Sequence, residues 1–226
     1  MLNQAVNNVP KAEILWLMAA KEAWLGGDVP TSRSILAEAF KANPESEQIW
    51  LAASKLEAEN GELDAARKLL TKARQIAQTD RVSLLADTRV TSLTLKQIWI
   101  KSAVFERLHG DAATALATVN EGIQLYPTAD KFYMMKGQIL ESQNEIAKAR
   151  EAYSTGCKKC PDSIPLWILS SRLEEKAGMA IKSRALIERG RQLNPRNEEL
   201  WLESVKIEER LGNASQAKVN MARGKI

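Results

Sequence analysis

The sequence predicts an all-α fold, a solenoid of about six helix-turn-helix units, and the regular spacing of its aromatic residues is the first reason. Six of the 12 aromatic residues are tryptophan. One aromatic anchor stands in each unit: Trp16, Trp50, Trp99, Tyr133, Trp167 and Trp201. The step between successive anchors is constant, except that the step from Trp50 to Trp99 is longer than the others. The longer step indicates one insertion in a repeat array.

The second observation is a residue type that ends helices, found 11 positions after every anchor. These residues are Gly27, Gly61, Gly110, Asn144, Gly178 and Gly212. Glycine and asparagine accept the left-handed backbone conformation in which many helices stop. A helix of about three to four turns is therefore expected to carry each anchor and to end there.

The third observation is a set of small residues and prolines in the same phase. The small residues, 16 and 23 positions after the anchors, are Ser32, Ala66, Ala115, Ala149, Ser183 and Ala217, then Ala39, Ala73, Gly122, Gly156, Gly190 and Gly224. The prolines are Pro10, Pro44, Pro127, Pro161 and Pro195. Small side chains let two helices approach closely, and proline closes the second helix of a unit. One hairpin cannot bury its own apolar face, so the units are expected to stack.

The repeat phase also defines the domain organisation. We expect residues 1–226 to form a single repeat array that is a fragment of a longer one, because neither end of the sequence reads as a polar capping unit. The insertion is placed at residues 83–97, since removing them restores the phase and the apolar residue before Trp99. That segment has no clean amphipathic period and is predicted to be a protruding loop or an irregular helix extension.

Composition excludes several classes of protein. The sequence is 45% apolar and 27% charged, which is typical of a folded soluble chain. The net charge of +4 is spread along the sequence without a run of five basic residues. The longest apolar run, Ile14 to Ala20, is too short to cross a bilayer. Two cysteines and the lack of a secretory signal at the start favour a reducing, intracellular compartment.

Residues with catalytic chemistry are few, and the sequence predicts no enzyme and no cofactor. Cys157 and Cys160 form a lone CxxC pair, whereas a zinc site needs two more ligands and the single histidine, His109, lies in another unit. A thioredoxin-type role needs a preceding strand, which the pattern does not predict. The tryptophans keep strict repeat phase, so we interpret them as core residues and not as a surface that stacks on bases.

Charged residues recur in two further positions of the repeat. At the seventh position after the anchor, four units carry an acid: Glu57, Glu106, Glu174 and Glu208. Ten positions further stand the bases Arg33, Arg67, Arg150, Arg184 and Lys218. We expect pairs within one hairpin, namely Glu57 with Arg67, Glu174 with Arg184 and Glu208 with Lys218. Two units depart from the pattern in the acid, at Ala23 and Leu140, and one departs in the base, at Leu116.

Tryptophan, small residues and proline at this constant period resemble the tetratricopeptide family, and the added acid and base resemble its half-a-tetratricopeptide (HAT) variant. This resemblance implies a right-handed superhelix and a role in RNA-processing assemblies. The segments KFYMMKGQILESQNEIAKAREAYSTGCKKCPDSIPLWILSSRLEEKAG and NPRNEELWLESVKIEERLG resemble the carboxy-terminal repeats of the pre-mRNA-processing factor 6 family. That resemblance implies a nuclear, non-catalytic scaffold that bridges proteins of the spliceosomal tri-snRNP. It implies indirect or weak RNA contact, with no small-molecule substrate and no membrane.

The same pattern leaves two alternatives open and suggests a binding face. The alternatives are a HAT scaffold of another complex, in 3′-end or ribosomal RNA maturation, and a direct RNA-binding module. If the first helices line a concave surface, the side chains facing it are Lys21, Lys55, Val104, Gln138, Arg172 and Lys206, flanked by Ile100 and Met134. Basic ends around an apolar centre suit an extended peptide with acidic ends. Alternatively, Lys55, Arg172 and Lys206 pair with acids along their own helices.

Overall fold

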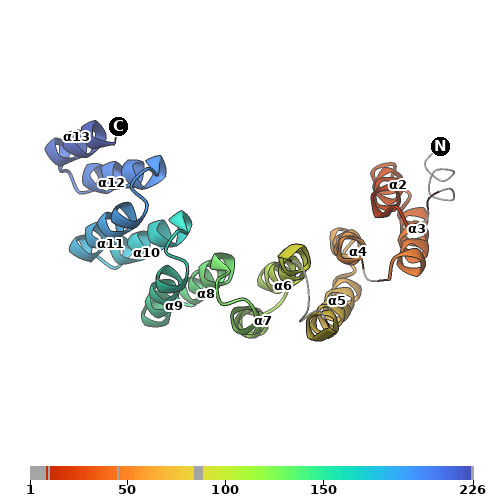
Figure 1. The fold of residues 1–226 in the computed structure, drawn as a ribbon. Helices are drawn as coiled ribbons and strands as arrows, with labels where there is room; N and C mark the ends of the chain where they lie inside the picture. Colours follow the sequence, from red (N-terminus) through yellow and green to blue (C-terminus); the bar gives the residue numbers. More distant parts are fainter. Residues whose placement is uncertain (1–8, 10, 45, 84–88, 225–226) are drawn as a thin grey trace. The chain divides into compact units, whose positions relative to one another are not determined.

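The computed structural model describes residues 9, 11–44, 46–83 and 89–224, and within these ranges it consists of helices joined by turns, with no strand (Figure 1). The helices are α2 (Glu13–Leu25), α3 (Val29–Ala42), α4 (Glu47–Glu59), α5 (Leu63–Ser83), α6 (Arg89–His109), α7 (Ala112–Leu125), α8 (Asp130–Ser142), α9 (Ile146–Lys159), α10 (Ile164–Lys176), α11 (Ala180–Leu193), α12 (Glu198–Arg210) and α13 (Ala214–Arg223). The predicted all-α repeat fold is confirmed.

The chain divides into two compact units, Met1–Asp111 and Ala112–Ile226. In the first unit α2 packs on α3 and α4 packs on α5, and α6 packs against both α4 and α5. In the second unit the pairs are α8 with α9, α10 with α11 and α12 with α13, and α7 packs on α8. Figure 1 shows these paired helices as consecutive hairpins. Each hairpin also contacts the next one in its own unit, as the repeat pattern predicts.

Local sequence explains where the helices begin and end. Asp28 accepts a hydrogen bond from the backbone N–H of Thr31 and caps α3, and Asn197 does the same for α12 through Leu200. Most of the predicted helix-ending residues have positive φ, namely Gly27, Gly61, Asn144, Gly178 and Gly212. Gly110 is the exception in this set, because it stays outside the left-handed region.

The two helices around the expected insertion are longer than the others. Both α5 and α6 have 21 residues, whereas the remaining first helices have 13. Helix α6 begins at Arg89, so residues 89–97 extend the helix that carries Trp99 and are not a loop. Residues 84–88 lie outside the described ranges. The assignment of 83–97 as the insertion stays a prediction.

Each aromatic anchor lies on the first helix of its repeat. Trp99, Tyr133 and Trp167 are buried, and the anchors Trp16, Trp50 and Trp201 are partly buried. Four anchors donate a hydrogen bond to the carbonyl of the preceding repeat proline: Trp50 to Pro44 at 3.3 Å, Tyr133 to Pro127 at 2.9 Å, Trp167 to Pro161 at 2.8 Å and Trp201 to Pro195 at 3.3 Å. The repeat proline therefore has a second role beyond ending a helix, since its carbonyl fixes the orientation of the next anchor ring.

The second small position of the repeat is held by glycine in several units because the anchor occupies the space where a side chain would be. A Cβ at Gly190 would lie 3.0 Å from the ring of Trp167, and one at Gly156 would lie 2.7 Å from the Cβ of Tyr133. Close contact between the two helices of the hairpin explains the small residue at this position.

The predicted acid-base pairing within one hairpin is wrong, because the arginine on the second helix of one hairpin binds the glutamate on the first helix of the next. The pairs are Arg33–Glu57, Arg67–Glu106, Arg150–Glu174 and Arg184–Glu208. Partners are 24 residues apart in sequence, and 39 apart for Arg67–Glu106, which spans the longer step between anchors. We call these four pairs the inter-repeat arginine ladder.

Arg184 on α11 shows how such a pair is made. It stands three positions before Ile187, so both side chains lie on the same face of the helix. Ile187 is buried in a core that contains residues of both α10 and α12. The guanidinium of Arg184 reaches α12, where its Nε and Nη2 contact the Glu208 carboxylate at 2.7 and 2.9 Å. This two-pronged contact satisfies a carboxylate that is only 7% exposed.

One step of the ladder is apolar. Leu116 on α7 and Leu140 on α8 have the same separation in sequence as the charged pairs, and they occupy the base and acid positions of that step. Leu140 is buried and Leu116 packs against the same core cluster. Both line a cavity of about 490 Å³ between α7, α8 and α9. The two departures from the charge pattern therefore compensate each other, because neither leaves an unpaired charge.

We expect the apolar step to be interchangeable with a charged one. Leu140→Glu alone should cost about 3 kcal/mol in the free energy of unfolding, because it places a carboxylate in the core without a partner. Leu116→Arg combined with Leu140→Glu should recover at least half of that loss. Urea unfolding of the two single variants, the double variant and the parent measures the coupling. A double variant that is no more stable than Leu140→Glu would contradict the assigned pairing.

Candidate protein-binding groove

A groove in the second unit runs across the first helices α8, α10 and α12. It encloses about 300 Å³ and is lined by Met134, Gln138, Pro165, Ile168, Leu169, Arg172, Glu199, Leu202, Glu203 and Lys206. Four of the residues proposed from sequence, Met134, Gln138, Arg172 and Lys206, meet here. Lys21, Lys55 and Ile100 belong to the first unit, where Ile100 is buried with 6% exposure and presents little surface.

The apolar part of this groove comes from the position that directly follows each anchor. Met134, Ile168 and Leu202 occupy this position on three successive first helices, and Leu169 adds to them. Ile168 is buried, Met134 is partly buried, and Leu202 is 48% exposed. A row of apolar side chains along successive helices suits a peptide that contributes apolar side chains of its own.

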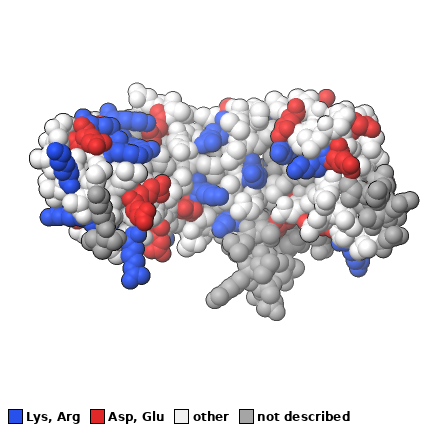
Figure 2. All heavy atoms as spheres, turned by 90° about the horizontal axis from the view of Figure 1, so that it is seen from above, with Lys and Arg blue, Asp and Glu red and all other residues white. Residues whose placement is uncertain are grey.

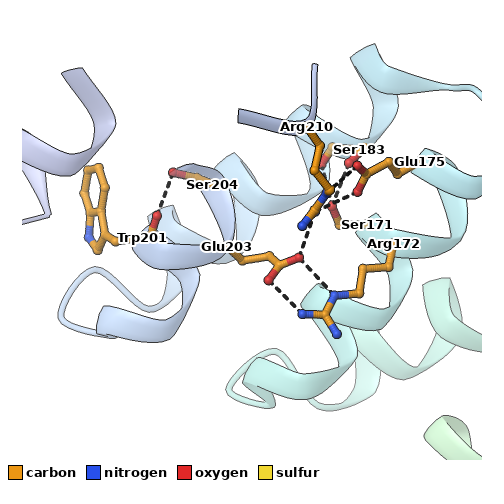
Figure 3. A network of polar contacts seen from close by, with 8 residues as sticks. All are labelled: Ser171, Arg172, Glu175, Ser183, Trp201, Glu203, Ser204 and Arg210. Carbon is orange, nitrogen blue, oxygen red and sulfur yellow. Dashed lines mark hydrogen bonds and ion pairs between the residues drawn. The ribbon is translucent and has the colours of Figure 1, made fainter. Parts of the chain in front are cut away.

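Arg172, which the sequence analysis placed on the binding face, binds Glu203 on α12. Its Nε and Nη2 lie 2.9 and 2.8 Å from the two carboxylate oxygens. Arg210 approaches the same carboxylate at 3.2 Å and also binds Glu175 of α10 at 2.6 and 2.8 Å. Figure 3 shows Glu203 between the two arginines, with Arg210 linking it to Glu175. This network connects α10 with α12, and two of its members, Arg172 and Glu203, also line the groove.

Glu203 is the most deeply buried member of the network, at 2% exposure. The hydrogen bonds from Arg172, followed by the contact with Arg210, lower the pKa of the Glu203 carboxyl despite its burial. The same contact with Glu203 raises the pKa of Arg172. The carboxylate therefore stays charged, and its stabilising effect depends on pH.

We expect the contribution of Glu203 to stability to disappear in acid. Its pKa in the folded chain is below the ordinary value of 4.5, so the stabilisation is complete above that pH and is lost as the pH falls through the folded pKa. At pH 7 the free energy of unfolding of the parent should exceed that of Glu203→Gln by about 2 kcal/mol, and the difference should shrink as the pH falls below 4.5 and through the folded pKa. Urea unfolding at pH 7, 5 and 3 measures it. A difference that is constant across this range would contradict the assignment.

The other basic residues of the expected face differ in their surroundings. Lys55 lies 3.6 Å from Glu59 on its own helix, as the alternative reading of the sequence proposed, and 5.6 Å from the centre of the Trp24 ring. Lys21 and Lys206 are exposed. In the groove itself, Arg172 and Lys206 are balanced by Glu199 and Glu203. The groove is thus closer to neutral than the sequence suggested, and its use for binding stays a proposal.

A second set of ion pairs between neighbouring hairpins was missed by the sequence reasoning. An acid at the eighth position after one anchor binds a base at the ninth position after the next: Glu141 with Lys176 at 3.1 Å, and Glu175 with Arg210 at 2.6 Å. Glu141 also accepts a hydrogen bond from the Tyr153 hydroxyl at 2.6 Å. The signal was present in the sequence, since the acid and base recur at fixed positions of successive units.

The cysteine pair singled out in the sequence lies in the core of the second unit. Cys157 and Cys160 are free and buried, and burial raises the pKa of the Cys157 thiol to about 12, which keeps it protonated at neutral pH. Over the described ranges, no three histidine, cysteine or acidic side chains cluster closely enough to hold a metal ion. None of the helices in these ranges has the length and apolarity needed to cross a membrane.

A family model for the tetratricopeptide repeat-like domain matches residues 27–175, which is more than half of the chain. The chain therefore belongs to this family of repeat proteins, whose members generally bind other proteins and are not enzymes. Its hairpins, fixed repeat phase and first-helix groove agree with that assignment.

Individual proteins resemble this chain in sequence or in fold. Pre-mRNA-splicing factor prp1 of Schizosaccharomyces pombe is 49% identical over 43 residues, which are 19% of this chain and 5% of the relative. Among solved structures, PilF of Pseudomonas aeruginosa matches 93% of this chain and 89% of its own with TM-score 0.57 and 15% identity. The pilus biogenesis factor PilW matches 93% and 91% with TM-score 0.56 and 19% identity. At such identities these structures show the fold alone.

Proposed function

We propose that the chain is a non-catalytic scaffold for protein-protein interaction in pre-mRNA splicing, acting in the nucleus to bridge proteins of the tri-snRNP. The observation that carries this proposal is the 43-residue segment that is 49% identical to pre-mRNA-splicing factor prp1. Because that segment is 5% of the relative, it supports a shared assembly and not the whole activity of the relative. The residues of the HAT pattern, an acid and a base that recur along the array, support the same class of complex.

The groove of α8, α10 and α12 is the binding site that we propose for a protein partner. Its apolar row ends in exposed Leu202, and its charges balance, so a peptide with apolar side chains fits better than a strongly acidic one. YrrB, a tetratricopeptide protein with TM-score 0.50 and 10% identity to this chain, is described as having an unusual peptide-binding site. Peptide binding on this kind of scaffold is therefore physically reasonable.

Two alternatives remain as outcomes of the test. A HAT scaffold of 3′-end or ribosomal RNA maturation would share the fold and the groove. Direct RNA binding would require basic side chains that track phosphates. Figure 2 shows lysine and arginine lying beside aspartate and glutamate on the face that it draws, with the two signs interspersed. That distribution favours protein binding over RNA binding on this face.

The test is affinity capture from nuclear extract, followed by mass spectrometry, with and without ribonuclease. The parent chain should capture tri-snRNP proteins in both conditions. Met134→Glu and Leu202→Glu should each reduce that capture at least about tenfold, because a charge is placed in the apolar row. Capture of 3′-end or ribosomal RNA maturation factors instead, or capture that ribonuclease abolishes, would overturn the proposal.

Matched controls separate the groove from general effects of a new charge. Met179 and Leu193 are 46% and 47% exposed and lie outside the groove, so Met179→Glu and Leu193→Glu should capture partners like the parent. Thermal melting confirms that all four variants fold. Loss of capture with Leu202→Glu but not with Met134→Glu would place the binding surface at the last hairpin and not in the groove.

A further inference from the structure

The second helices of the second unit have one side that no other helix covers. Helix α9 packs on α8 and α10, and α11 packs on α10 and α12. In residues 112–224, all of which the structure describes, the first helices α8, α10 and α12 contact one another in succession, whereas α9, α11 and α13 do not. Figure 1 shows these second helices on one side of the unit and the first helices on the other. We call the exposed side of α9, α11 and α13 the outer face.

Basic residues are concentrated on these second helices. Together α9, α11 and α13 carry ten basic residues and two acidic ones, whereas α8, α10 and α12 carry six basic and nine acidic ones. One set of helices is therefore strongly positive and the other is negative. The ten bases are Lys148, Arg150, Lys158, Lys159, Lys182, Arg184, Arg189, Arg191, Lys218 and Arg223, and the two acids are Glu151 and Glu188.

Ion pairs occupy four of the ten bases. Arg150 and Arg184 belong to the inter-repeat arginine ladder, and Lys148 and Arg191 each pair with an acid three residues away. The other six are exposed and form no ion pair with any residue that the structure describes. Four of these six lie on α9 and α11. Their charges are free to meet a ligand. The six are Lys158, Lys159, Lys182, Arg189, Lys218 and Arg223.

The repeat phase places bases at matching positions of successive second helices. Lys148 and Lys182 stand 15 positions after the anchors of their repeats, and Arg189 and Arg223 stand 22 positions after theirs. On α11, Lys182 and Arg189 are two helical turns apart, so they project on the same side at a separation of about 10.5 Å along the helix. Arg223 also lines a groove of about 310 Å³ between α11 and α13. A chain of negative charges that crosses α11 can therefore contact both positions.

We propose that the outer face binds the phosphate backbone of a paired nucleic acid. An acidic protein segment gains little from such a face, because exposed ion pairs between lysine or arginine and carboxylates contribute little. A nucleic acid differs, since its closely spaced phosphates hold condensed counterions, and the release of these ions drives binding to lysine and arginine. The segregated positive charge of α9, α11 and α13 is thus better suited to phosphates than to carboxylates.

The lack of exposed rings on these helices favours a duplex over a single strand. Helices α9, α11 and α13, which the structure describes in full, expose no aromatic side chain, and Tyr153 of α9 is completely buried. Proteins that bind single strands without sequence preference stack the bases on aromatic rings. A duplex needs no such rings, because its bases are already stacked and its backbone is the surface that a protein contacts.

This site is separate from the groove of α8, α10 and α12. None of the six free bases lines that groove, so a contact with nucleic acid adds to the protein contacts proposed above and does not replace them. Because phosphates are the same in every sequence, binding through the outer face is independent of base sequence and weakens steeply with salt.

Fluorescence anisotropy with a labelled RNA duplex of about 16 base pairs tests the proposal. At low salt the parent chain should bind with a dissociation constant on the order of 10 μM. Lys182→Gln combined with Arg189→Gln should weaken binding at least about tenfold, and should reduce the slope of log affinity against log salt by about two. A DNA duplex of the same sequence identifies the source of the phosphates. Equal affinity for both indicates recognition of the backbone charge alone, and tighter binding of RNA indicates that its A-form geometry contributes.

A matched variant removes the same charge elsewhere. Lys101→Gln combined with Lys131→Gln changes exposed lysines on the first helices α6 and α8, and should bind the duplex like the parent. Thermal melting confirms that both double variants fold. Capture of proteins from nuclear extract by the Lys182→Gln, Arg189→Gln variant should match that of the parent, so this test is independent of the groove.

Three results would overturn the proposal. The first is equal weakening by the two double variants, which would show an effect of net charge and not of the outer face. The second is a single-stranded RNA that binds more tightly than the duplex. The third is a polyglutamate of the same total charge that binds as tightly as the duplex, which would favour an acidic protein partner.

Discussion

The stacking of the hairpins depends on one interaction. In it, an arginine of one hairpin forms a bidentate ion pair with a buried glutamate of the next. Burying a carboxylate is expensive unless it is paired and fully hydrogen-bonded. Glu106, Glu174 and Glu208 are each at most 7% exposed, so each needs its arginine in one position. Because the partner lies on the neighbouring hairpin, the requirement fixes how hairpins align and not how one hairpin closes. Apolar packing supplies the attraction, and the forks select one register.

Much of the fold could be predicted because its signals are local. The anchors, the helix-ending glycines and the prolines act on their immediate neighbours in sequence, and the structure uses Gly61, Gly178 and Gly212 as expected. The ion-pair partners were harder to predict. A periodic sequence offers each acid two bases, one later in its own hairpin and one in the preceding hairpin. Spacing alone cannot choose between them.

One feature of the sequence does distinguish pairing within a hairpin from pairing between hairpins. Pairing within hairpins would leave Glu106 opposite Leu116, and Leu140 opposite Arg150, with two charges lacking partners. Pairing between hairpins matches Leu116 with Leu140 and leaves neither of those charges alone. The paired departures at Leu116 and Leu140 therefore indicated the correct pairing. The partner of Arg172, in contrast, could not be predicted from the sequence of its own helix. That partner, Glu203, lies 31 residues away on α12, beyond any pattern within a single helix.

The same contacts shape the candidate groove. Arg172 is one of the four basic residues that the sequence analysis placed on the binding face. Because it is paired with Glu203, the groove presents an apolar row between balanced charges. Arg172 and Glu203 are thus already paired with each other before any partner binds. What distinguishes the groove is therefore its apolar side chains, such as Met134 and Leu202, which take no part in ion pairs.

The most direct measurement is a comparison of two double-mutant cycles at Arg184, by urea unfolding at neutral pH. One cycle combines Arg184→Ala with Glu208→Ala across the hairpin boundary, and the other combines it with Glu174→Ala inside the hairpin. The account predicts a coupling energy of about 1 to 3 kcal/mol for the first cycle and less than about 0.5 kcal/mol for the second. A larger coupling inside the hairpin than across the boundary would contradict it.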